Sequence, residues 1–213
     1  MPGRRRQKRT ERSKVDATPP WEQRIREEVP PTDGPYDERD APDDEVARVD
    51  LGALRIPVEG EYDLRVDLNE AQQVIAATLA LADGTMQLGV FAAPRVEGIW
   101  DDVRAEIAES LNAQKRSNAT EADGPFGTEL HGSVPAEDGR GTVPVRFIGV
   151  DGPRWFLRAM LAGPVARDPA RSAVLEEALR GVVVVRGTEP LPVREPVPLK
   201  LPEDIELPEP GTA

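Results

Sequence analysis

Apolar and polar residues alternate in the segment 61–68, where four apolar side chains separate four charged ones. A period of two places the two kinds of side chain on opposite faces, so this segment predicts a strand with one face in water. Residues 73–81 and 85–92 flank an Asp-Gly pair, which is typical of a two-residue hairpin turn. In that hairpin one face is apolar, and the other is small or polar apart from Phe91.

Two segments, 97–113 and 169–180, have the pattern of helices. In the first, apolar residues recur at four-residue spacing, and acidic residues occupy the opposite face. The second follows Asp168, a good N-cap, has Pro169 at its first position and ends before Gly181. We therefore expect two helices among the strands.

The segment 143–164 predicts a second hairpin and concentrates Arg146, Arg154 and Arg158. A loop with an odd number of residues would place the apolar residues of both strands on one face and Arg146 opposite Arg158 on the other. An even loop would instead place Arg146 among the apolar residues of the second strand. Because arginine is rarely buried without a partner, we expect the odd register and an outward cluster of the three arginines.

These elements predict one α+β domain: a mostly antiparallel sheet of about six to seven strands with two helices packed on one face. We expect the domain to span residues 50–202, including a proline-rich extended segment near its end. Residues 1–49, a basic arm followed by an acidic, proline-rich stretch, and the acidic residues 203–213 have the composition of disordered tails.

Composition narrows the classes of function. The 213-residue chain contains no cysteine, which excludes disulfides, thiolate metal sites and cysteine nucleophiles and suits a reducing cytoplasm. Its apolar runs are shorter than the roughly 20 residues that cross a bilayer. The basic N-terminus is not followed by a hydrophobic segment, so we do not read it as a secretory signal. We expect a cytoplasmic protein without a membrane span.

Charge is unevenly spread along the chain. The net charge is −12, yet residues 1–14 carry seven basic residues and one acid, a local charge of 7 − 1 = +6. The candidate contacts of this arm with nucleic acid or another anion include Arg4, Arg5, Arg6, Lys8 and Arg9. The alternative is a solvated tail. Because the remainder is acidic, we expect nucleic acid to be a partner only through the arm.

Recognisable catalytic chemistry is sparse. His131 is the only histidine and has neither a second imidazole nor a thiol with which to bind a metal. The chain lacks the spacing of a phosphate loop or a known nucleophile motif, so we assign no catalytic residue, metal or cofactor. The cluster of Arg146, Arg154 and Arg158 is the candidate ligand site, for a carboxylate, a phosphate or an acidic peptide. The alternative is pairing with the protein's own acids.

Several short motifs occur in the order found in a known family: VDLG at Val49–Gly52, FAAPRVEGIWDDVR at Phe91–Arg104, VDGPRWFLR at Val150–Arg158, VVVVRG at Val182–Gly187 and LKLP at Leu199–Pro202. In these motifs the chain resembles the actinobacterial domain of unknown function 3710. The resemblance covers roughly residues 49–202. It implies no activity and no catalytic residues.

Three functional hypotheses follow. The first is a non-enzymatic cytoplasmic binding or adaptor domain with a protein partner whose identity the sequence leaves open. The second is a sensor of a small anion, or an enzyme, that uses Arg146, Arg154 and Arg158. The third is association with nucleic acid through the basic arm. The missing nucleophile motif favours the first, while the question of enzymatic activity stays open.

Overall fold

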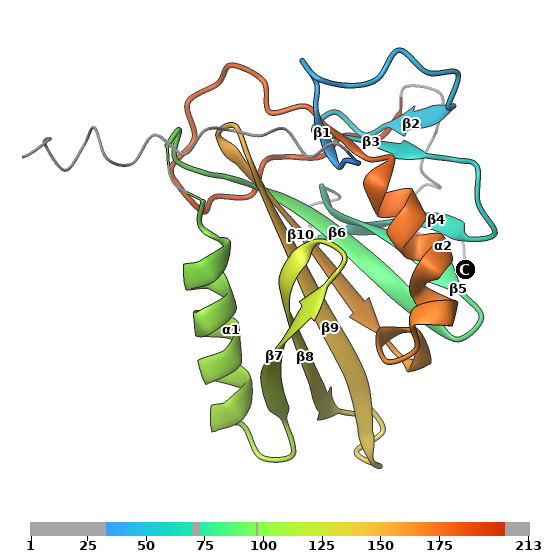
Figure 1. Ribbon diagram of the computed structural model, residues 1–213, viewed down its shortest axis with the longest axis vertical. Coiled ribbons are helices and arrows are strands. Elements are labelled where there is room, and N and C mark those ends of the chain that lie inside the picture. The colour runs from blue at the N-terminus through green and yellow to red at the C-terminus, as the bar shows by residue number, and fades with distance from the viewer. Residues whose placement is uncertain (1–32, 70–72, 97, 203–213) are drawn as a thin grey trace, which may run out of the picture.

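The computed structural model describes residues 33–69, 73–96 and 98–202. Its centre is a seven-stranded antiparallel sheet (Figure 1). In spatial order its strands are β4 (Asp63–Leu68), β5 (Val74–Leu81), β6 (Gly84–Ala92), β10 (Trp155–Ala162), β9 (Thr142–Gly152), β8 (Gly127–Pro135) and β7 (Asn118–Gly124). The α+β class expected from the sequence is confirmed.

A second, four-stranded sheet lies beside the main one. Its strands, in spatial order, are β1 (Tyr36–Asp37), β11 (Val183–Val184), β3 (Leu54–Pro57) and β2 (Arg48–Asp50). The pair β1 and β11 is parallel, while the other pairs are antiparallel. This small sheet joins the core on the side of α2, because Leu54, Ile56 and Val184 belong to the same buried cluster as Leu175 and Leu179.

The two helices cover opposite faces of the main sheet, and the expectation that both pack on one face was wrong. Helix α2 (Pro169–Arg180) buries its apolar side with Leu157 and the other odd-numbered residues of β10. Helix α1 (Trp100–Ala113) packs against Phe147 and Phe156, which face the other way. The reason is that β9 and β10 are apolar on both faces, and each face must be covered.

The register of the hairpin β9–β10 also differs from the expectation. Trp155 pairs with Gly152, so the loop contains two residues, Pro153 and Arg154, and the even register is the observed one. Arg146 consequently lies opposite Leu161 on the face covered by α2 and is 5% exposed. The premise of the prediction failed because this arginine is buried together with partners.

The N-cap of α2 and the apolar face of the hairpin β5–β6 are confirmed. The turn of that hairpin is Ala82–Asp83 rather than the expected Asp-Gly pair, because Gly84 already pairs with Leu81. The Asp168 side chain caps α2 by accepting a hydrogen bond from the main-chain N–H of Ala170 at 3.0 Å. In the hairpin β5–β6, Leu79 pairs with Met86, and both side chains are fully buried on the face expected. One residue departs from the pattern: the register between β4 and β5 shifts at Ile75, which is 56% exposed.

The described residues include strands that precede the domain boundary expected at residue 50. Strand β1 and most of β2 fall in the stretch that was expected to be a disordered tail. The indole N–H of Trp155 donates to the buried carboxylate of Asp37 at 2.8 Å, which fastens this stretch to the main sheet. Residues 1–32 and 203–213, the remainder of the expected tails, lie outside the described residues.

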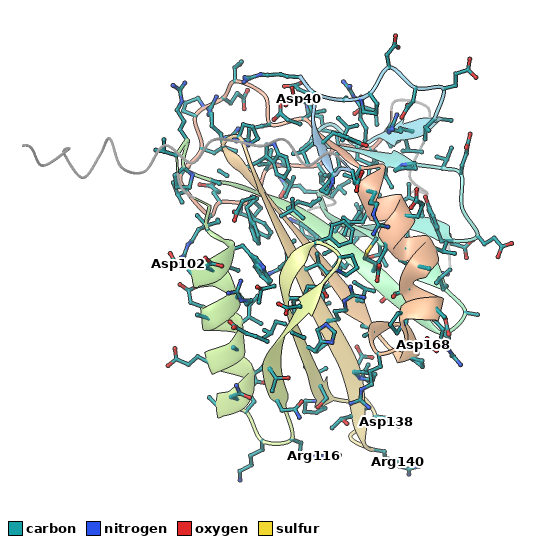
Figure 2. All side chains as sticks on the ribbon, in the orientation of Figure 1. Asp40, Asp102, Arg116, Asp138, Arg140 and Asp168 are labelled. Atoms are coloured by element: carbon teal, nitrogen blue, oxygen red, sulfur yellow. The ribbon has the colours of Figure 1, made fainter. Side chains whose placement is uncertain are left out.

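At the far end of the sheet, the Arg116 side chain bonds to the main chain of the β8–β9 loop. Arg116 follows α1 with a φ of 67° and donates to the carbonyl oxygens of Gly139 at 3.1 Å and Gly141 at 2.9 Å. Figure 2 shows Arg116 and Arg140 at this same end, which is the end opposite β1. In the part of the chain that the structure describes, no helix is both long enough and apolar enough to span a membrane.

Candidate ligand-binding groove

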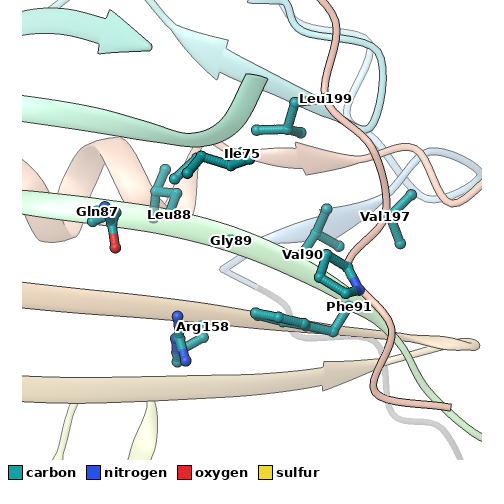
Figure 3. A pocket seen from close by; sticks show the side chains of 11 residues that line it. Ile75, Gln87, Leu88, Gly89, Val90, Phe91, Arg158, Val197 and Leu199 are labelled. Carbon is teal, nitrogen blue, oxygen red and sulfur yellow. The ribbon is translucent and has the colours of Figure 1, made fainter. Parts of the chain in front are cut away.

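A groove opens where strand β6 changes its neighbour. Strand β5 pairs with β6 only as far as Leu88. From Val90 onward the neighbour is the extended segment 194–199, and the N–H of Val197 donates to the carbonyl of Val90 at 2.9 Å. Because β5 and this segment diverge, a hollow of about 250 Å³ remains between them (Figure 3). Its residues Phe91 and Arg158 lie on the sheet face that also carries α1, whereas Val197 and Leu199 belong to the buried cluster on the α2 side.

The walls of this groove are mostly apolar. They are formed by side chains from β5, β6 and the extended segment, chiefly Ile75, Phe91, Pro196, Val197 and Leu199. Two long polar side chains, Gln87 and Arg158, complete the lining. An apolar hollow with a few polar groups is the usual composition of a site for a small organic ligand.

Arg158 supplies the only charge among the groove-lining residues. On β10 it lies between Gly89 of β6 and Gly149 of β9, so the flanking strands place no side chain directly beside it. Its guanidinium carbon lies 5.1 Å from the centroid of the Phe91 ring, a cation–π contact. Burial lowers the pKa of the Arg158 guanidinium below its ordinary value, although arginine remains charged at physiological pH.

Arg158 differs from most arginines of the described residues in its lack of an ion pair. Among the described residues, no carboxylate forms an ion pair with this guanidinium, although several other arginines form ion pairs with aspartate or glutamate. Arg48 pairs with Asp44 and Arg171 with Asp83, each at 2.7 Å. A partly buried guanidinium whose N–H groups have no carboxylate partner can bind a ligand carboxylate through two parallel hydrogen bonds.

Gln87 is held in one orientation by a neighbouring acid. Its amide Nε2 donates to the Oδ2 atom of Asp67 at 2.9 Å, and the Thr78 hydroxyl donates to the same oxygen at 2.8 Å. An ionised carboxylate only accepts hydrogen bonds, so Gln87 must present its NH₂ group to Asp67. Its carbonyl oxygen therefore lies on the other side of the amide, toward Arg158 in Figure 3.

Arg146, the first arginine of the predicted cluster, has a different environment. It forms two hydrogen bonds to Glu129, including one from Nη2 to Oε1 at 3.0 Å, and a third from Nη1 to Glu176 at 2.6 Å. The Ser172 hydroxyl also donates to Glu176, at 2.8 Å. Burial alone lowers the pKa of Arg146, but the hydrogen bonds to Glu129 and Glu176 outweigh burial and raise it. This group fastens α2 to the sheet.

Arg154 lies at neither of these places. It occupies the turn between β9 and β10 with a φ of 64°, and its carbonyl accepts from Ala93 N at 3.0 Å and Arg186 Nε at 3.2 Å.

Arg146 and Arg158 face opposite sides of the sheet. The structure thus brings no two members of the predicted cluster together, and only Arg158 lines the groove. The basic arm Arg4, Arg5, Arg6, Lys8 and Arg9 lies outside the described residues.

His131 belongs to the Arg146 network. Its Nε2 atom lies 3.2 Å from Glu129 Oε2, and it pairs across the strands with Arg146, on the face opposite the groove. The groove lining therefore contains neither His131 nor any carboxylate that could act as a general acid or base. Within residues 33–69, 73–96 and 98–202, no three histidine, cysteine or acidic side chains are grouped as metal ligands would be.

Sequence reasoning selected Arg158 but missed the groove around it. One signal was present: the outward face of the β5–β6 hairpin is small or polar except for Phe91. A lone aromatic residue on such a face offers a ring surface against which a long side chain or a ligand can pack. The second wall was not visible, because it comes from the segment 194–199, far along the chain.

The geometry defines an α+β domain that carries a small amphipathic groove. The comparison with protein families agrees with the resemblance noted in the sequence. The family described as "Protein of unknown function (DUF3710)" matches residues 34–207, and the chain belongs to this family. No curated protein matches the chain.

Proposed function

We propose that this protein is a non-enzymatic binding domain that holds a carboxylate at Arg158, with the apolar part of the ligand against the groove wall. The observation that carries the proposal is the partly buried guanidinium of Arg158, which is without a carboxylate among the described residues. In a chain with 39 acids and 27 basic residues, an arginine in this position needs an explanation.

Energetics support this proposal. Removing a charge from water without a partner is costly, and a ligand carboxylate would offset that cost when it binds. The Phe91 ring supports one face of the guanidinium but does not neutralise it. Because both flanking residues on the neighbouring strands are glycines, the donors of Arg158 stay accessible from the groove.

The size of the groove limits the ligand. Its volume of about 250 Å³ lies slightly below the range for sites that enclose a drug-sized molecule. It suits a short aliphatic acid or one residue of a larger partner. The exposed side chain of Ile75 would become buried in either case, and burial of apolar surface contributes roughly 25 cal/mol per Å².

A binding role is also supported by the chemistry of the lining. Gln87 and Arg158 can bind and orient a ligand, but the lining offers no hydroxyl, thiol or imidazole to attack it. His131 lies on the other face of the sheet with Glu129 and Arg146. The proposed setting is the cytoplasm, which suits a sequence without cysteine.

Titration with hexanoate and with neutral hexanamide tests this proposal. NMR chemical shifts of the full chain should report hexanoate binding around Phe91, with hexanamide binding at least tenfold more weakly. Arg158→Gln should remove that preference, and Arg140→Gln, at the far end of the molecule, should keep it. Equal affinities of the wild-type protein for the two compounds, or a preference that persists in Arg158→Gln, would overturn the proposal.

A second candidate function is favoured by the charge of the N-terminal arm. Residues 1–14, with a local charge of +6, could contact phosphates of RNA or DNA. Filter binding should then show retention of single-stranded RNA that falls steeply with salt and is lost when residues 1–14 are deleted. Retention that survives the deletion would exclude the arm as the contact.

A further inference from the structure

The groove presents a donor and an acceptor side by side. Arg158 pairs with Gly89 across the strands, and Gln87 pairs with Met160, so Arg158 and Gln87 are diagonal neighbours on adjacent strands. Diagonal positions in an antiparallel pair are separated by about 7–8 Å between Cα atoms. A single small group can therefore reach the guanidinium with one end and the Gln87 carbonyl oxygen with the other.

This pair of groups selects among anions. A fatty acid carries no hydrogen-bond donor close to its carboxylate, so it leaves the Gln87 oxygen without a partner. The last residue of a peptide carries both features on one Cα atom, an α-carboxylate and an amide N–H. The orientation of Gln87, which Asp67 holds through Nε2, keeps an acceptor rather than a donor available to that N–H.

The apolar wall supplies the remaining selectivity. Ile75, placed outward by the irregular register of β5, lines the groove together with Val197 and Leu199. A branched aliphatic side chain next to the carboxylate would fit between them and remove Ile75 from water. Charged side chains would lose hydration there without gaining an ion pair.

We infer that the groove binds the C-terminal residue of a partner's peptide chain, with a leucine-like side chain. In this arrangement the α-carboxylate binds Arg158, the amide N–H of the same residue donates to Gln87 Oε1, and the side chain contacts Ile75, Val197 and Leu199. The inference rests on the proposed function and makes it specific for peptide termini.

Three matched peptides test the inference. The probes are acetyl-Ala-Leu with a free carboxylate, the same peptide with a C-terminal amide, and the free acid with an N-methyl group on leucine. Calorimetric titration of the full chain should give at least a tenfold loss of affinity on amidation and about a fivefold loss on N-methylation. Equal affinity for the free acid and its N-methyl form would overturn the inference.

A substitution on the protein side separates this inference from the proposed function. Gln87→Met has a similar volume and lacks the acceptor, so it should bind the free acid and the N-methyl peptide equally. If the N-methyl penalty persists in Gln87→Met, the peptide inference fails while carboxylate binding stands. If hexanoate binds no better than hexanamide, the proposed function itself fails. The N-methyl comparison on wild type does not depend on the folding of any variant.

Discussion

Arg146 and Arg158 lie on neighbouring strands of one sheet, yet their surroundings differ sharply. Arg146 is buried beneath α2 between Glu129 and Glu176, and its guanidinium donates to both acids. Arg158 lies on the opposite face of the sheet, forms a cation–π contact with the Phe91 ring and has no carboxylate partner among the described residues. The comparison shows that an arginine's partners, rather than its burial, distinguish a structural cation from a candidate binding group.

The largest expected effect is that of Arg146→Met. It leaves Glu129 and Glu176 buried without their cation, and the loss of one member of a buried charged group typically costs about 3–5 kcal/mol. Urea denaturation should show a decrease of this size in the free energy of unfolding. Arg140→Gln, an exposed control, should change it by less than about 0.5 kcal/mol. A loss below about 1 kcal/mol in Arg146→Met would contradict the structural role.

A smaller effect is expected when only one acid is neutralised. In Glu176→Gln the side-chain oxygen still accepts from Arg146 and Ser172, but the charge is removed. Because Glu129 retains the bidentate pair, the free energy of unfolding should fall by roughly 1–2 kcal/mol. The same denaturation measurement checks this value. A loss as large as that of Arg146→Met would mean that Glu129 alone does not hold the arginine.

Filling the groove should affect binding far more than stability. A Cβ atom on Gly89 would lie 3.3 Å from the Phe91 ring, so the ring must shift slightly to admit any side chain there. Gly89→Leu should occupy the groove beside Arg158, weaken hexanoate binding at least tenfold and change the free energy of unfolding by less than about 1 kcal/mol. Hexanoate binding at wild-type affinity would place the ligand elsewhere.

The smallest expected change in stability is that of Arg158→Gln. The substitution loses a cation–π contact but removes a partly desolvated charge, and these two effects oppose each other. The free energy of unfolding should stay within about 0.5 kcal/mol of wild type. A loss of 2 kcal/mol or more would show that Arg158 supports the fold, and the contrast with Arg146 would then disappear.

Local patterns predicted much of this fold. The N-cap Asp168 and the apolar face of the β5–β6 hairpin follow from neighbours in sequence, and both are as expected. The register of β9–β10 could not be predicted in the same way. The two acids that permit Arg146 to be buried come from β8 and α2, which sequence pattern alone does not bring to it.

The candidate site shows the same limit. Arg158 was selected as a candidate from its sequence context, but its grouping with Arg146 and Arg154 was wrong. The groove exists because the segment 194–199 takes over from β5 as the neighbour of β6. Such an exchange of partners depends on long-range main-chain pairing, which leaves no local period in the sequence.

The contrast between the two arginines can be tested most directly with the side-chain Nε–H signals of the full chain in a ¹H–¹⁵N NMR spectrum. On addition of hexanoate, the signal of Arg158 should shift and exchange more slowly with water, while that of Arg146 should stay unchanged. An unchanged Arg158 signal at saturating hexanoate, or a shift confined to other arginines, would contradict the assignment of Arg158 as the binding group.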